Sequence, residues 1–163
     1  MPAQHKLMED AIIPDLVKFL DINDETKARG RELWELLDLH ADAVIERFYA
    51  KVRTHDISSH VTDEAIVRLK SRQKAHWAAL FGGQFDADYF NSVRRIGTRH
   101  RDIMLNPMWY VAGYMMLKIE FTNVIADAAL PPITKGRFIK ALDKFAAFDM
   151  ALALSTYDAA VLD

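Results

Sequence analysis

The sequence has 163 residues, of which 51% are hydrophobic and 27% charged, and its formal net charge is −2. A chain of this size and composition is expected to form a single domain, residues 1–163, with a substantial apolar core. Basic and acidic residues are interleaved except around residue 100, so nucleic acid is not expected as a partner. The absence of cysteine excludes disulfides, thiolate metal sites and cysteine nucleophiles, and it fits a reducing, cytoplasmic location.

Two segments bear on membrane insertion. Residues 1–10 carry charges and no long apolar run, so we expect neither a secretion signal nor a membrane anchor there. The longest apolar stretch, Met108–Leu117, has about half the length of a bilayer-spanning helix and is followed by Lys118. We therefore expect it to be a buried helix, with no insertion of this domain into a membrane.

Helical spacing of apolar residues runs through the chain and no segment alternates as a strand does, which predicts an all-α fold. After an N-terminal extension over residues 1–20, Asn23 or Asp24 is expected to cap a helix that runs to about Arg53. Gly30 or the segment 40–42 is a candidate point for dividing this helix in two.

Two further helices are bounded by polar caps and glycines. Thr62 is expected to cap a helix that ends near Phe81, where Gly82–Gly83 closes it. Asp86 is expected to cap the next helix, which runs to about Leu105.

The last two helices begin at prolines or near them. Asn106-Pro107 places an asparagine at the cap and a proline at the first helical position, and this helix should run to about Ala129. Pro131-Pro132 breaks the chain, and a final helix is expected from about Thr134 to about Ala160. Because helical spacing continues to the last residues, we expect the sequence to be part of a longer protein.

One histidine lies on the apolar face of the helix expected after Asp86. At helical spacing it belongs to a stripe made of Tyr89, Val93, Ile96, His100 and Ile103. Two interpretations stay open for such an imidazole. It is either a core histidine that donates to a backbone carbonyl, or the ligand of a metal in a dry pocket.

Other kinds of site find little support in the sequence. No pair of histidine or glutamate residues has the spacing of a zinc or di-iron site, no serine lies in the context of a nucleophile, and no glycine-rich phosphate loop is present. We therefore assign no catalytic residue.

His76 shares a helix face with Leu69, Gln73 and Leu80, and it either points into the interior or faces solvent beside a bound ligand.

A flat apolar cofactor with one axial imidazole, of which haem is the obvious example, would use a single inward histidine. It would also use the aromatic residues Phe48, Tyr49, Trp77, Trp109 and Tyr110. The alternative for each of these aromatics is ordinary packing in the core.

Four separated motifs resemble one family. The segment Arg95–Ile103, followed by Pro107–Tyr110, closely resembles the proximal region of the globin-coupled sensors, which are haem-based sensors related to protoglobins. Three further motifs resemble the distal half of that family: Phe48-Tyr49, Leu69-Lys70, and His76-Trp77 with Phe81. The likeness extends over about residues 20 to 160.

This resemblance implies a globin fold, a three-over-three helical sandwich with an extra N-terminal helix, that holds one haem b. His100 matches the proximal iron ligand, and Tyr49 matches the distal tyrosine whose hydroxyl donates to bound O2. Leu69 would control access to the iron, Phe48 would pack on the haem, and Trp109-Tyr110 match the pair packed behind the proximal histidine. The cofactor-binding residues expected on this basis are Phe48, Tyr49, Leu69, Arg72, Gln73, His76, Ile96, Ile103, Trp109 and Tyr110.

The sequence departs from the family pattern at one distal position. Members often carry a threonine one turn after the distal leucine, and this chain has Arg72 there. Arg72 is expected to reach either solvent or a haem propionate, with Gln73 or Ser71 nearby as substitute donors, and His76 is expected to contact a propionate.

The implied function is a gas sensor, for O2 above all and with CO and NO as further ligands, that regulates an output module absent from this chain. Such a module would be an aerotaxis transducer, a diguanylate cyclase or a histidine kinase, so the domain itself is not expected to be an enzyme. Ligand binding would move His100 and its helix and displace Trp109-Tyr110. The alternatives are a haem enzyme that reduces peroxide or oxidises NO, and a helical interaction module without cofactor.

A homodimer is expected to form through the last two helices. The apolar face predicted for it comprises Gly113, Met116, Leu117, Glu120, Leu142, Phe145, Ala146, Met150 and Leu154.

Overall fold

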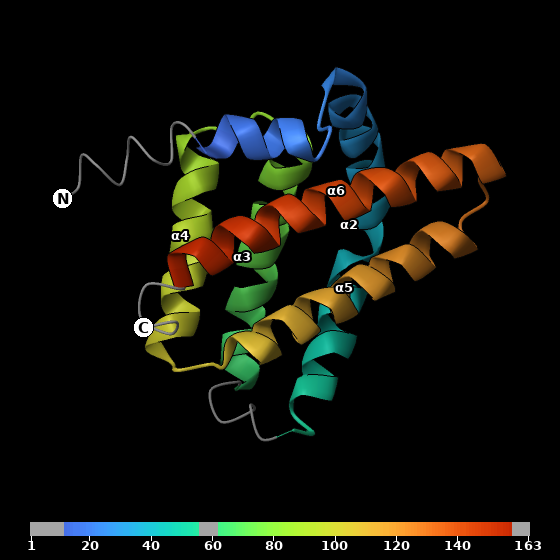
Figure 1. Ribbon diagram of the computed structural model, residues 1–163. Helices are drawn as coiled ribbons and strands as arrows, with labels where there is room; N and C mark the ends of the chain where they lie inside the picture. The colour runs from blue at the N-terminus through green and yellow to red at the C-terminus, as the bar shows by residue number, and fades with distance from the viewer. Residues whose placement is uncertain (1–11, 56–61, 158–163) are drawn as a thin grey trace.

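The computed structural model describes residues 12–55 and 62–157, and within these ranges it contains helices and no strands (Figure 1). Residues 12–19 form a short N-terminal helix. The helices that follow are α2 (Asp24–Val52), α3 (Asp63–Gly82), α4 (Ala87–Asp102), α5 (Pro107–Asp127) and α6 (Pro132–Tyr157). The predicted all-α fold is therefore confirmed. None of the described helices is long and apolar enough to cross a membrane.

The long C-terminal helices form an antiparallel pair. Figure 1 shows α5 and α6 side by side and crossing in front of α3 and α4. Helix α6 also packs against α2, so it contacts every other labelled helix of the domain. This arrangement gives two layers of helices, as expected for a globin fold.

The predicted caps are the caps observed. The side chains of Asn23, Thr62 and Asp86 each accept a hydrogen bond from the backbone N–H three residues further on, at 2.9, 3.1 and 3.0 Å. Asn106 accepts from the N–H of Met108 at 2.9 Å, and Pro107 occupies the first turn of α5. Each cap satisfies a backbone donor that the helix cannot pair internally, which explains why the four helices begin where they do.

Gly30 does not divide α2, and the segment 40–42 does not either, because the helix is continuous from Asp24 to Val52. The prediction of a break is therefore wrong. A Cβ atom at Gly30 would lie 2.5 Å from Cε2 of Phe145 and 2.9 Å from the carbonyl oxygen of Phe81. Glycine is needed there because α2 passes too close to α6 and α3 for any side chain.

Helix α4 ends at Asp102, earlier than the predicted Leu105. Met104 adopts a left-handed conformation with φ of 57°, and its N–H donates to the carbonyl of Arg101 at 2.9 Å. The N–H of Leu105 donates to the carbonyl of His100 at 3.0 Å. These two bonds form a Schellman motif, in which a left-handed residue reverses the chain and satisfies the last carbonyls. The turn fixes how the chain leaves His100 and enters α5.

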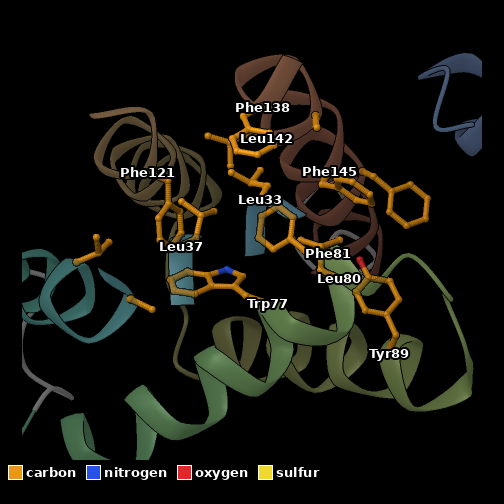
Figure 2. Packing of buried hydrophobic residues seen from close by; sticks show 14 of the residues in the cluster. Leu33, Leu37, Trp77, Leu80, Phe81, Tyr89, Phe121, Phe138, Leu142 and Phe145 are labelled. Atoms are coloured by element: carbon orange, nitrogen blue, oxygen red, sulfur yellow. The ribbon is translucent and has the colours of Figure 1, made fainter. Parts of the chain in front are cut away.

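The apolar core lies between α6, the middle of α2, the C-terminal ends of α3 and α5, and the first half of α4 (Figure 2). The Trp77 ring meets Phe121 edge-on with centroids 4.8 Å apart, and Phe81 meets Phe145 at 5.5 Å. The fully buried part of α3 is its C-terminal end, made of His76, Trp77, Leu80 and Phe81. The N-terminal part of α3 is only partly buried within the described protein. The candidate site lies beside this less buried part of the helix.

Candidate functional site

His100 lies in the last turn of α4, half-buried, with an unusual hydrogen-bonding state. Its Nδ1 is inaccessible to solvent and makes no hydrogen bond of ordinary geometry within the described structure. Burial lowers the pKa of His100; the carbonyl of Ile96 acts in the opposite direction, and the charge of Arg99 adds to the effect of burial. The imidazole is therefore held neutral, which is the form that binds metals.

Tyr110, in the first turn of α5, lies against His100. The two ring centroids are 5.1 Å apart and the rings are inclined by 55°. Tyr110 is buried, whereas its neighbour Trp109 is 37% exposed and has its ring 6.1 Å from that of His55. Of the aromatic pair predicted behind His100, the structure brings Tyr110 to the histidine and turns Trp109 outward.

Phe48 and Tyr49 lie together near the end of α2, with ring centroids 5.2 Å apart and an edge-to-face arrangement. Burial raises the pKa of Tyr49 to about 12, so its hydroxyl stays protonated and keeps a proton to donate. A Cβ atom at Gly113 would lie 3.3 Å from Cζ of Phe48, which places the Phe48 ring on α5. Gly113 follows Tyr110 by one helical turn, so the start of α5 contacts both the Phe48-Tyr49 pair and His100.

Three of the predicted site residues of α3 are less buried than the core residues at its C-terminal end. Leu69 and Gln73 are half-buried, and Arg72 is exposed. Helix α4 packs against α3, and the apolar residues one turn on either side of His100, Ile96 in α4 and Ile103 at its C-cap, are half-buried. Both helices therefore carry apolar side chains that the protein covers only in part.

His76 is buried, and both nitrogens of its ring are engaged. Nδ1 lies 2.7 Å from Oγ of Ser92, and Nε2 lies 2.8 Å from Oδ1 of Asp149. The ring also stacks on Tyr89 with centroids 5.5 Å apart. The predicted contact of His76 with a haem propionate stays a prediction, and it would have to replace one of these two bonds.

Asp149, on α6, is the centre of a buried polar group that the sequence analysis did not identify. Besides its bond to His76, it accepts hydrogen bonds from the hydroxyls of Tyr89 and Tyr114, both at 2.7 Å. We call Asp149, His76, Tyr89, Tyr114 and Ser92 the Asp149 cluster. The available signal was an acidic residue within the apolar series of the last helix, between Phe148 and Met150.

The charges of this cluster follow from its contacts. Burial alone would raise the pKa of Asp149, but the opposing charge of His76 and the hydrogen bonds from His76, Tyr114 and Tyr89 outweigh it and hold the pKa below its ordinary value. Burial, with the charge of Asp149, raises the pKa of Tyr89 and of Tyr114. The carboxylate is therefore ionised and both phenols are protonated donors.

The residues around His100 fit a haem. An iron porphyrin needs as little as one side-chain ligand, and His100 offers a neutral, half-buried imidazole of the kind that serves. Partly covered apolar residues on α3 and α4 would supply contacts for a flat apolar ring. Among the described residues, no group of three or more His, Asp and Glu side chains could bind a metal ion without such a ring.

The face predicted to form a dimer belongs largely to the core. Gly113 packs against Phe48, Glu120 forms an ion pair with Arg47 at 2.9 Å, and Phe145 is fully buried. Leu142 and Ala146 are buried as well. The prediction is therefore wrong for Leu142, Phe145 and Ala146, because amphipathic spacing alone does not tell which face meets a neighbouring helix. Besides Trp109, α5 exposes four large apolar residues at helical spacing, which we call the outer stripe: Met108, Val111, Met115 and Ile119.

The two-layered helical fold, with one inward histidine before a helix break, defines a globin-type domain. The family model described as Protoglobin matches residues 9–161. The chain belongs to the protoglobin family.

A curated relative is the heme-based aerotactic transducer HemAT of Halobacterium salinarum. It is 29% identical over an alignment 164 positions long, which covers 92% of this chain and 33% of the relative. The chain thus spans about one third of the length of that relative. The globin domain of a Geobacter sulfurreducens globin-coupled sensor matches with a TM-score of 0.78 and 18% identity, over 89% of this chain and 97% of that one. The ferric globin domain of E. coli DosC matches with a TM-score of 0.74 and 15% identity, over 89% and 99%. The structural likeness confirms the predicted globin fold.

The ionised state of Asp149 predicts a pH dependence. Since folding holds the pKa below its ordinary value of 3.8, Asp149 stabilises the fold above that value, and this contribution is lost as the pH falls through the folded pKa. Between pH 5 and pH 3, wild-type protein should therefore lose more free energy of unfolding than Asp149→Asn. Urea unfolding across this range measures the difference. The control Asp143→Asn, an exposed carboxylate on the same helix, should behave as wild type. Equal acid sensitivity of Asp149→Asn and wild type would contradict the assignment.

Proposed function

We propose that this domain is a haem-based O2 sensor that holds one haem b through His100 and signals to an attached output module. The observation that carries the proposal is the neutral, half-buried imidazole of His100, packed against Tyr110 within a protoglobin fold. Haem supplies the iron at which a diatomic gas binds. Ile96 and Ile103 flank the ligand on its own helix, and Tyr110 packs on its ring.

Tyr49 is the proposed donor to the bound gas. O2 held at a ferrous iron carries partial negative charge, and a phenol in a dry pocket stabilises that charge by a hydrogen bond, whereas CO gains less. Because burial raises the pKa of Tyr49 to about 12, the proton stays on the hydroxyl at any physiological pH. Phe48 meets the Tyr49 ring edge-on and packs against Gly113 of α5, so the pair lies beside the helix that also contacts His100.

The proposal includes a homodimer formed through α5 and α6. A second copy of the chain is the partner that fits the outer stripe of α5, whose apolar residues follow one another at helical spacing and are exposed. The greater length of the transducer relative supports an output module beyond this domain. CO and NO are further expected ligands.

We propose sensing rather than turnover, and a cytoplasmic location. A peroxidase or NO dioxygenase is the alternative that Tyr49 and Arg72 leave open, and of these two side chains Arg72 is exposed. The lack of cysteine supports a reducing compartment.

Replacement of His100 tests the ligand. Wild-type protein purified with haem should show a Soret band, and His100→Ala should lose it and regain it with added imidazole, because a small free ligand then fills the vacated position. The matched control is His40→Ala, an exposed histidine of α2 that should leave the band unchanged. A wild-type protein that takes up no haem would refute the proposal and favour the cofactor-free module.

The Tyr49→Phe variant isolates one hydroxyl. Loss of a hydrogen bond to a partly charged ligand should speed O2 dissociation by about 10- to 100-fold, because such a bond contributes about 1.5–3 kcal/mol. CO dissociation should change much less. Stopped-flow measurement of both rates decides the matter, and an unchanged O2 off-rate would remove Tyr49 from the role of donor.

A charge placed in the outer stripe tests the dimer. Ile119→Glu should convert a wild-type dimer into a monomer, as measured by light scattering after size exclusion, because the interface would bury an unpaired carboxylate. Leu39→Glu provides the control, since Leu39 is an exposed leucine of α2 that lies outside the stripe. An Ile119→Glu variant that stays dimeric at the same concentration would exclude this face.

A further inference from the structure

The Asp149 cluster joins helices that otherwise meet through apolar contacts. Asp149 belongs to α6, His76 to α3, Tyr89 to the first turn of α4 and Tyr114 to α5. Each partner bonds directly to the same carboxylate, His76 and Tyr89 at Oδ1 and Tyr114 at Oδ2. A single side chain of α6 is therefore hydrogen-bonded to the helix that carries His100 and to the helix that touches it.

A continuous series of contacts leads from His100 to this carboxylate. The ring of His100 lies 5.1 Å from that of Tyr110, and the Tyr110 ring lies 6.0 Å from that of Tyr114. The hydroxyl of Tyr114 then donates to Asp149 at 2.7 Å. Tyr110 and Tyr114 are one turn apart on α5, so a shift of one is transmitted to the other through the helix.

Helix α4 also reaches α6 without an intermediate. A Cβ atom at Gly97 would lie 1.8 Å from Oγ1 of Thr156 and 2.7 Å from the carbonyl oxygen of Ala153. Gly97 precedes His100 by about one turn, and Tyr89 anchors the other end of the helix at Asp149. With two such contacts, α4 has little freedom to move without moving α6.

Because its hydrogen bonds are buried, the Asp149 cluster can transmit a displacement from one helix to another. Asp149 is 3% exposed, so a hydrogen bond broken at its carboxylate is not replaced by water. A displacement of Tyr89 or Tyr114 must then carry Asp149 with it or leave a buried charge poorly paired. The low local dielectric strengthens both the bonds and the penalty for losing them.

We propose that Asp149 is the positioning residue that couples His100 to the α5–α6 pair, so that the ligand state of the site changes α6 through the Tyr114 and Tyr89 hydrogen bonds. This inference rests on the proposed ligation of haem by His100. It assigns the output end of the coupling to α6 near Asp149, and not to the exposed ion pairs of the same helix.

The test compares hydrogen exchange of ferrous, haem-loaded protein with and without carbon monoxide, by mass spectrometry of peptides from α5 and α6. In wild-type protein, CO should change the exchange of residues 107–127 and 132–157. In Asp149→Asn the CO-dependent change in α6 should fall to less than about half of the wild-type value, because the coupling, not the ligand binding, is lost. Asp143→Asn, which removes an exposed α5–α6 ion pair, should keep the wild-type change.

Tyr114→Phe is the second variant, and it decides the matter if Asp149→Asn does not fold or does not hold haem. It removes one donor at an oxygen of Asp149 and leaves the ring that packs on Tyr110, so it should also reduce the CO-dependent change in α6. An undiminished change in both variants, or no change in wild-type protein that binds CO, would overturn the proposed coupling through Asp149. Absence of a Soret band and of any spectral response to CO would instead refute the proposed haem site itself.

Discussion

The contact between α4 and α6 at Gly97 is the constraint on which the site depends. Because no Cβ is present, the backbone of α4 lies directly against Ala153 and Thr156, and the helix can present only one face to α6. The buried residues of that face, Tyr89, Val93 and Gly97, follow one another at one-turn intervals. The stripe predicted from spacing is thereby divided: Tyr89 and Val93 are buried with Gly97, whereas Ile96, His100 and Ile103 are only half-buried.

Two buried polar groups near this contact, the Asp149 carboxylate and Nδ1 of His100, differ in their hydrogen bonding. Asp149 has hydrogen-bonded partners at both of its oxygens, which is the usual condition for an ionised group in a core. Nδ1 of His100 has none of ordinary geometry among the described residues, and an unpaired buried polar atom costs about 1–3 kcal/mol. The Ile96 carbonyl nevertheless acts on the imidazole, since it opposes the effect of burial on the pKa of His100.

The local part of this structure was predictable from the sequence, and the part that depends on contacts between helices was not. Asn23, Thr62, Asp86 and Asn106 cap helices because of their own side-chain chemistry, so each start was predicted correctly. The role of Gly30 depends on Phe145, far along the chain, and spacing alone suggested a break instead. The Asp149 cluster is still less visible, since its hydrogen bonds join residues 73, 60 and 35 positions apart. His100 and Tyr49 were identified through a family resemblance that adds information about tertiary contacts to the local pattern.

Helix α5 connects the inside of the site to the surface. Tyr110 and Gly113 face His100 and Phe48, whereas the outer stripe lies on the exposed side of the same helix. A helix of 21 residues is roughly 30 Å long and moves nearly as a rigid rod, so a displacement at Tyr110 reaches Ile119. The Lys118–Asp143 and Tyr114–Asp149 bonds join this helix to α6, so the two helices must move together or break these bonds, of which the one at Asp149 is buried. Since the exposed Lys118–Asp143 pair is a weak restraint compared with the buried one, the position of α6 relative to α5 is set mainly at Asp149.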